Sequence, residues 1–305
     1  MLKRNVIAAA LLTAVFGTAH ATVSFTFDHN GAAAGGAVAG VTTLDWLPGN
    51  ALAVGGNPSG GLQPGDAITL LYQANLGVMT DGTSVLYANG LPNFFTAVAG
   101  FGEIVTSNSG GTATFAIDPN ATSFLYIYAT GAAGNNLTGL GFTSGDIILK
   151  ATLQSVTSSS FTASGGLATF DNFQGDSYGG TQTITGTGAP DLVWKVTDVD
   201  TNYFKNLLGG LLTTSINSSL VTPFAQTNPS RAFSSDGIAN GDVAHNIGPC
   251  NGCPQASGSD LNFQFQADAN SSFERVAIPE PGSLALLGLG LGALGLLRRR
   301  EKATA

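Results

Sequence analysis

The sequence predicts an all-β protein, an antiparallel β-sandwich or jelly roll that forms a single domain. Three observations lead to this class. Short segments with apolar residues at every second position recur along the middle of the chain. They are rich in Val, Ile, Thr, Phe and Tyr, and Gly, Asn, Asp or Ser punctuates nearly every gap between them. Such segments are typical of strands joined by tight turns rather than of alternating strands and helices.

Nine segments carry this pattern clearly, and we expect each to form a strand. In chain order they are 22–27, 67–73, 112–117, 124–129, 146–156, 161–163, 167–173, 192–199 and 261–266. Residues 124–128 are apolar on both alternations, so we expect a central strand that is buried on both faces. The stretch 203–212 is the one helical candidate, and Gly209 and Gly210 within it weaken that interpretation.

The composition excludes two classes of binding protein. Charged residues make up 10% of the 305 residues, and six of the eleven Lys and Arg lie at the two ends, so residues 22–279 carry a net charge of −12. A domain of this charge has no basic stripe for nucleic acid and no basic face for anionic lipid. Its hydrated surface must consist of Ser, Thr, Asn, Gln and Gly. We expect the Gly-rich stretch 31–65 to be loose.

The first 21 residues have the three zones of a secretory signal peptide. Lys3 and Arg4 precede an apolar run over residues 6–16, and Ala19-His20-Ala21 has the small-x-small form of a signal-peptidase site. The apolar run is too short to be a stable membrane span. We therefore expect cleavage after Ala21, which leaves Thr22 as the mature N-terminus.

The C-terminal segment 276–305 has three ordered parts. They are Pro279-Glu280-Pro281, the apolar run 284–297, and Arg298, Arg299 and Arg300. The run of 14 residues is shorter than the ~20 that cross a bilayer, and the Gly residues within it weaken it as a free helix. We expect a short sorting helix that contacts the membrane transiently, with its arginines on the cytoplasmic side.

These three parts resemble the PEP-CTERM sorting signal, which occurs on proteins of bacteria that also make an exopolysaccharide and an exosortase. The resemblance implies that this integral-membrane enzyme removes the segment near Pro279-Glu280-Pro281, after which the protein is released or attached to the surface. It implies signal peptidase and exosortase as partners during export from a Gram-negative bacterium. The expected organisation is a signal peptide (1–21), an extracellular β domain (22–275) and a sorting segment (276–305).

Three interior blocks carry a second resemblance. Residues 260–273, 200–204 and 221–224 resemble the flocculation-associated PEP-CTERM proteins, secreted proteins implicated in cell aggregation within exopolysaccharide. The resemblance implies a noncatalytic protein that promotes aggregation and cohesion of the matrix, and it supplies no catalytic residues to transfer.

An alternative function is an exopolysaccharide-binding adhesin that uses loop aromatics. Sugars stack on exposed aromatic rings, and Trp46 lies in the loop-like region 45–50, so Trp46 is the candidate sugar contact. Trp194 sits within a strand pattern and is expected in the core.

Cys250 and Cys253 are the sole cysteines, and in an exported chain we expect a disulfide that pins the loop 248–254. A thioredoxin-like redox site would need a helix after the pair, whereas Pro254 and a Ser/Gly run follow. His245 would complete only three zinc ligands, a weak signal in an oxidising compartment. We expect neither a metal nor a cofactor.

Other motif matches give little support for catalysis. The GxSxG match at 175–179 points to Ser177 as the nucleophile of a secreted hydrolase, but a strand-like run follows it where a nucleophile elbow needs a helix. The GxGxxG match at 290–295 lies inside the sorting helix. The calcium-loop beginning at Asp198 has Tyr203 and Gly209 where an EF-hand needs Gly and Glu. Glycoside hydrolysis needs two positioned carboxylates, which the two interior glutamates, Glu103 and Glu274, neither support nor exclude.

Overall fold

The computed structural model describes residues 21–33, 35–54, 62–90, 92–136, 141–163, 186–207, 210–217 and 262–275. All except Ala21 belong to one compact unit, Thr22–Arg275. The regular elements formed by these residues are all β-strands, which confirms the all-β class for this part of the chain.

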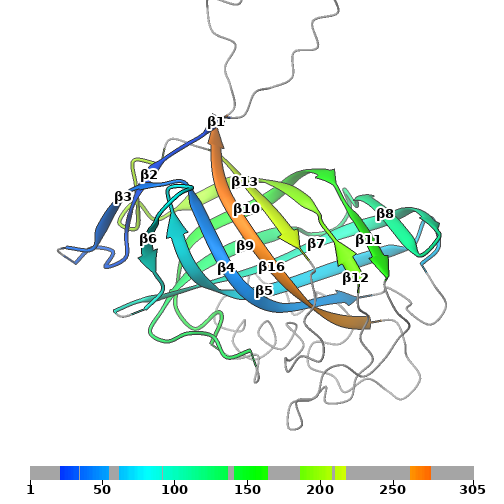
Figure 1. Ribbon diagram of the computed structural model, residues 1–305, viewed down its shortest axis with the longest axis horizontal. Coiled ribbons are helices and arrows are strands. Elements are labelled where there is room, and N and C mark those ends of the chain that lie inside the picture. The colour runs from blue at the N-terminus through cyan, green and yellow to red at the C-terminus, as the bar shows by residue number, and fades with distance from the viewer. Residues whose placement is uncertain are drawn as a thin grey trace, which may run out of the picture. The chain divides into compact units, whose positions relative to one another are not determined.

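Eight antiparallel strands form a closed barrel (Figure 1). In the order given at the end of this paragraph, each strand pairs with the next one, and β16 pairs with β4 to close the barrel. The predicted sandwich or jelly roll is therefore wrong, because the sheet closes on itself and leaves no second sheet to face it. The eight strands are β4 (Thr43–Val54), β5 (Ala67–Thr80), β7 (Phe94–Ser109), β9 (Phe124–Thr130), β10 (Asp146–Ser158), β13 (Asp191–Val199), β15 (Leu211–Asn217) and β16 (Asn262–Arg275).

Three short strands lengthen one end of the barrel. β8 (Thr112–Ile117) pairs with the second half of β7, beyond the half that pairs with β9. β11 (Ser160–Ala163) continues β10 after Ser159 and pairs with β8, and β12 (Gly186–Gly188) pairs with β11. We call this the extended end. Two further short strands, β6 (Val85–Ala88) and β1 (Ala21–Thr22), pair with β5 and β16.

A separate three-stranded sheet packs against the other end. It consists of β14 (Phe204–Lys205), β2 (Phe25–Asp28) and β3 (Ala37–Val41). The ring of Phe27 lies 4.9 Å from that of Phe95 at the start of β7, and the ring of Phe25 lies 4.9 Å from that of Phe273 near the end of β16. Edge-to-face aromatic contacts of this kind fill this end of the barrel.

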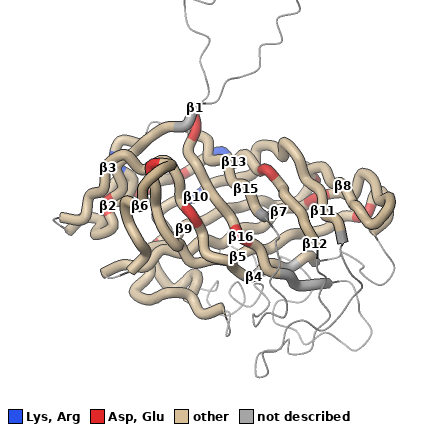
Figure 2. Tube along the Cα trace, viewed as in Figure 1, with Lys and Arg blue, Asp and Glu red and all other residues tan. Residues whose placement is uncertain are grey.

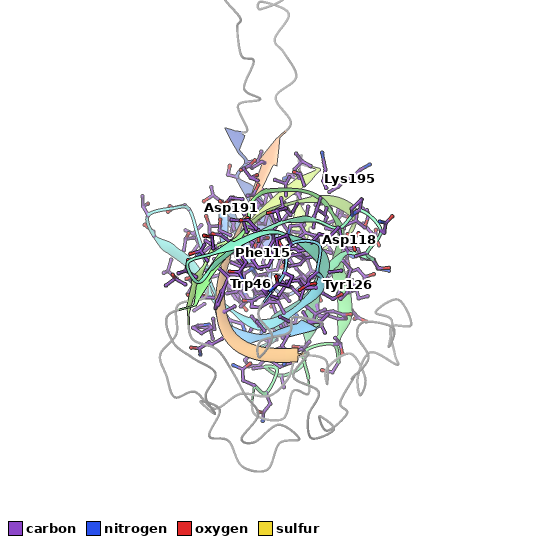
Figure 3. The ribbon with its side chains drawn as sticks, turned by 90° about the vertical axis from the view of Figure 1, so that its right-hand side faces the viewer. Trp46, Phe115, Asp118, Tyr126, Asp191 and Lys195 are labelled. Atoms are coloured by element: carbon purple, nitrogen blue, oxygen red, sulfur yellow. The ribbon has the colours of Figure 1, made fainter. Side chains whose placement is uncertain are left out.

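Alternation along the strands separates the barrel core from the surface. Leu192 and Trp194 of β13 are fully buried, whereas the next residue, Lys195, points to the opposite face and is exposed. Figure 3 shows Lys195 at the edge of the drawn side chains. The rings of Trp194 and Phe101 meet edge to face at 6.0 Å, although β13 and β7 are not adjacent strands. Side chains therefore pack across the interior, and the expected core position of Trp194 is confirmed.

A loop covers part of the outer face. Phe142, between β9 and β10, packs with Leu71, Val98, Phe124 and Tyr128, all of which point away from the barrel core. Asn75 holds the loop by donating to the carbonyl of Gly134 and accepting from its N–H, each over 2.8 Å. Residues 124–128 lie in β9, and their predicted burial on both faces of the sheet is therefore confirmed.

The predicted strands 67–73, 112–117, 124–129, 146–156, 161–163 and 192–199 lie within observed strands, as do 262–266 of the last one. The prediction 22–27 covers parts of β1 and β2, and 167–173 lies outside the described residues. The helical candidate 203–212 is wrong, because it contains β14 and the start of β15. The expectation that 31–65 is loose is also wrong over β3 and β4.

Candidate functional site

Most of the predicted functional residues lie outside the described part of the chain. This applies to the sorting segment 276–305, and to Ala19, Ser177, His245, Cys250 and Cys253. Ala21 is described as the first residue of β1. Among the residues described, no helix has the length and apolar character needed to cross a membrane.

Trp46 is described, and its predicted placement in a loop is wrong. It lies within β4 and is 3% exposed. Its indole Nε1 donates a hydrogen bond of 3.0 Å to Oγ of Ser271 on the neighbouring β16. A ring this deeply buried has no face on which a sugar can stack, so the structure removes Trp46 as a sugar contact.

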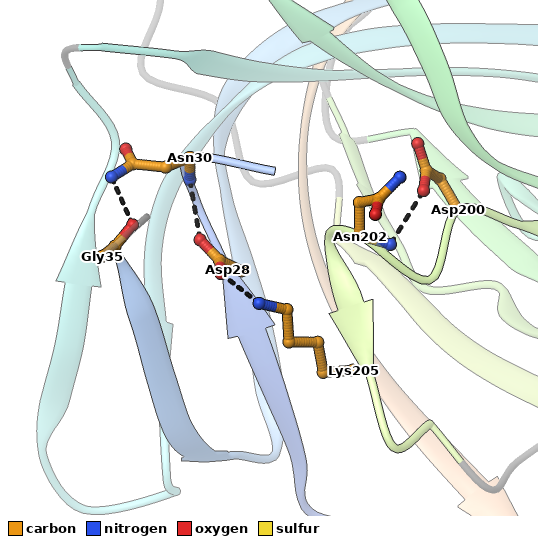
Figure 4. Close-up of polar contacts among 6 residues, drawn as sticks. All are labelled: Asp28, Asn30, Gly35, Asp200, Asn202 and Lys205. Atoms are coloured by element: carbon orange, nitrogen blue, oxygen red, sulfur yellow. Dashed lines mark hydrogen bonds and ion pairs between the residues drawn. The ribbon is translucent and has the colours of Figure 1, made fainter. Parts of the chain in front are cut away.

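Asp198, the first residue of the calcium-loop match, lies within β13, and Asp200 begins the turn after this strand. Asp200 follows β13 and accepts a hydrogen bond of 2.8 Å from the N–H of Asn202 (Figure 4). Within the described residues, no group of three or more His, Cys, Asp or Glu side chains is arranged to hold a metal ion.

A cavity of about 70 Å³ lies inside the extended end of the barrel. Its wall is almost entirely apolar and comes from strands on all sides. Ala53 of β4, Leu70 of β5, Phe101 of β7 and Phe115 of β8 contribute to it. One water molecule needs roughly 10–15 Å³ of cavity volume measured in the same way. The cavity is several times larger than this, so it has room for a short alkyl group.

Glu103 is the one charged side chain that the described residues contribute to this wall. It lies on the inner face of β7, opposite Ile68 of β5, and is 1% exposed. The side chain of Ser159 hydrogen-bonds the carboxyl group, whereas Oε1 has no hydrogen-bond partner among the described residues. Burial raises the pKa of Glu103 to about 7, although the Ser159 bond acts in the opposite direction.

The surroundings of Glu103 restrict its chemistry. The basic residues of the described chain are Lys150, Lys195, Lys205 and Arg275, and none of them lines the cavity. No second carboxylate among the described residues lines it either, so the paired carboxylates of glycoside hydrolases are not formed there. The arrangement lets Glu103 accept a hydrogen bond from a donor that enters the cavity.

Sequence reasoning did not single out Glu103 as a binding residue. The available signal is one glutamate in an otherwise uncharged and mainly apolar run, Phe94–Val105. Alternation along that run places Glu103 on the same face as Phe95 and Phe101, which is a face of the core.

Comparison with known proteins identifies the C-terminal segment. Residues 277–300 match the PEP-CTERM protein-sorting motif. The match includes Pro279-Glu280-Pro281 and the three arginines, and it confirms that the chain carries this sorting signal. The motif implies processing by an exosortase and export to the cell surface or extracellular space of a Gram-negative bacterium. Neither a curated protein nor a solved structure matches the chain.

Proposed function

We propose that this chain is a noncatalytic exported protein that promotes cell aggregation and cohesion of an exopolysaccharide matrix. The sorting motif at 277–300 carries the proposal, because it implies delivery to the place where such a matrix forms. Signal peptidase and exosortase act on the chain during export, and matrix polysaccharide is the proposed partner afterwards.

The surface of the barrel supports this proposal. Exposed positions of β10 are occupied by Thr152, Gln154 and Ser155. On β7 and β8, the hydroxyl of Thr114 lies 2.7 Å from that of Thr106 and 2.6 Å from that of Ser107. Hydroxyl and amide groups both donate and accept hydrogen bonds, as sugar hydroxyls do.

Charge is sparse on the described strands, as Figure 2 shows, and acidic residues outnumber basic ones. A surface of this kind hydrates well and offers little attraction to polyanions. We infer that it mixes with polysaccharide without a basic patch.

The adhesin alternative loses its named contact, because Trp46 is buried. The hydrolase alternative depends on Ser177, which lies outside the described residues. The noncatalytic assignment is part of the proposal. It rests on the sequence around Ser177, where a strand-like run follows the GxSxG match in place of the helix that a nucleophile elbow needs.

Replacing Pro279-Glu280-Pro281 with three alanines tests the role of sorting. The matched control replaces Glu301 and Lys302 with alanine, because these residues follow the matched motif. We expect the first variant to accumulate in the membrane fraction and the cells to settle more slowly, whereas the control behaves like wild type. Fractionation with antibody detection measures the location, and the settling rate measures clumping.

A strain that lacks the whole chain tests the function itself. We expect it to clump less, and expression of the unmodified chain should restore clumping. Normal clumping without the chain would overturn the proposal, even if the sorting signal acts as described.

A further inference from the structure

We propose that the cavity at the extended end of the barrel binds a small, mainly apolar molecule that carries one hydrogen-bond donor, preferably an amine, and that Glu103 accepts this donor. The proposal concerns the inside of the barrel and does not depend on a role in the matrix.

The shape of the site supports a small ligand. The cavity extends inward to Tyr72 and Phe101, and the ring of Phe101 packs against Trp194 behind it. At its other end the barrel is filled by the rings of Phe25, Phe27 and Phe273. A ligand therefore occupies the extended end only. Its apolar part gains free energy by leaving water for this wall.

The unpartnered oxygen of Glu103 sets the polar requirement. Buried polar atoms in folded proteins are nearly always hydrogen-bonded, and Oε1 of Glu103 lacks a partner among the described residues. A donor on the ligand would supply that bond. An ammonium group would supply it most strongly, since a hydrogen bond between opposite charges is shorter and stronger than a neutral one.

The rest of the wall argues against acidic ligands. Among the described residues it contains no Lys, Arg or His, so a bound carboxylate would meet no counter-charge there and would lie near Glu103. In the described part of the wall, Tyr72 is the other titratable side chain. Burial raises the pKa of Tyr72 well above its usual value, as do the charges of Asp268 and Asp45, so its hydroxyl stays neutral.

Three probes with the same four-carbon chain test the proposal: butylamine, butanol and butyrate. Titration calorimetry of the full chain at about 0.15 M salt, where long-range charge effects are largely screened, measures each affinity. We expect saturable one-to-one binding with butylamine tightest, butanol weaker and butyrate undetectable.

Variants assign the binding to the cavity. Glu103→Gln keeps the shape of the side chain and should weaken butylamine at least about tenfold, while butanol changes by less than about threefold. Ala53→Leu fills the cavity and should abolish binding of both. Asp198→Asn is the matched control, because it removes one carboxylate from an exposed position on β13.

Several results would overturn the proposal. These are no saturable binding of butylamine, butyrate binding as tightly as butylamine, or an equal loss in Asp198→Asn and Glu103→Gln. If the cavity variants unfold, methyl NMR spectra of the unmodified protein decide. Butylamine should then shift the methyl signals of Ala53 and Ile68, and shifts confined to exposed residues would count against the site.

Discussion

The indole Nε1 of Trp46 donates a hydrogen bond of 3.0 Å to the Oγ of Ser271, across 225 residues of sequence. The two residues lie on β4 and β16, the strands whose pairing closes the barrel. Oγ1 of Thr214 on β15 lies 3.0 Å from the same Ser271 oxygen. We call the β4–β16 pairing the seam of the barrel. A buried side-chain hydrogen bond therefore joins this seam in addition to its backbone hydrogen bonds.

Ser271→Ala should destabilise the barrel by about 1–3 kcal/mol, because it leaves the buried indole N–H without its acceptor. Ser272→Ala is the control, since this neighbour points to the opposite face of β16 and should change the free energy of unfolding by less than about 0.5 kcal/mol. Urea unfolding of both variants measures the difference. Equal losses would show that the Trp46 contact adds nothing to the seam.

An ion pair between a buried aspartate and a partly exposed lysine links two strands of the small sheet. Asp28 on β2 is 2% exposed, and Lys205 on β14 donates to its carboxylate (Figure 4). The N–H of Asn30 donates to the same side chain over 3.1 Å. Burial alone would raise the pKa of Asp28, but these hydrogen bonds and the nearby positive charges outweigh it and hold the pKa below its usual value.

Lys205→Met should destabilise the protein by about 1–2 kcal/mol at neutral pH, a modest value because the lysine is partly exposed. A lowered pKa means that the stabilisation is present above the ordinary aspartate pKa of 3.8 and is lost as the pH falls through the folded value. The difference from wild type should therefore shrink in acid. Urea unfolding near pH 7 and near pH 3 tests this, with Lys195→Met on the exposed face of β13 expected to have no effect.

Alternation of apolar residues locates the strands that have no interruption. β8 has the predicted bounds, and β9, β10 and β13 differ from prediction by a few residues at most. β7 is not among the predicted strands, and its sequence contains Gly100 and Gly102, a residue type that is depleted in strands. A Cβ at Gly100 would lie 2.5 Å from the ring of Phe124, so this glycine permits close packing within the sheet.

The loop predicted over residues 45–50, which include Pro48 and Gly49, is part of β4. The strand continues through these residues, and its register with β5 shifts between Trp46 and Asn50. Proline is tolerated in a sheet at such an irregularity. The buried position of Trp46 follows from this continuation and not from any local pattern.

Closure into a barrel could not be predicted from the strand pattern. Sandwiches and barrels both use alternating residues with one face in the core. The distinction depends on which distant strands pair, here β16 with β4. The cavity at Glu103 depends on the same pairings, because its wall combines residues from both sides of that seam and from β7 and β8.

Two glycines at the ends of the loop between β9 and β10 should respond differently to alanine. A Cβ at Gly145 would overlap the backbone carbonyl of Ala129, whereas a Cβ at Gly131 would meet nothing. Gly145→Ala should cost about 1–3 kcal/mol through this crowding. Gly131→Ala should stabilise by up to about 1 kcal/mol, because alanine reduces the entropy of the unfolded chain. Thermal unfolding ranks the two variants, and a similar loss in both would contradict the described packing of Gly145.

Glu103 should make the stability of the barrel depend on pH. Burial raises its pKa from 4.5 to about 7, so between these values the folded protein retains a proton that the unfolded chain has lost. Stability should fall as the pH rises through this range, by about 3 kcal/mol in total, since each pKa unit corresponds to about 1.4 kcal/mol. Glu103→Gln cannot ionise, and its free energy of unfolding relative to wild type should rise over the same range. Urea unfolding near pH 5 and near pH 8 measures this change, with Asp198→Asn as control; a difference that does not vary with pH would contradict the burial of an ionisable carboxyl group.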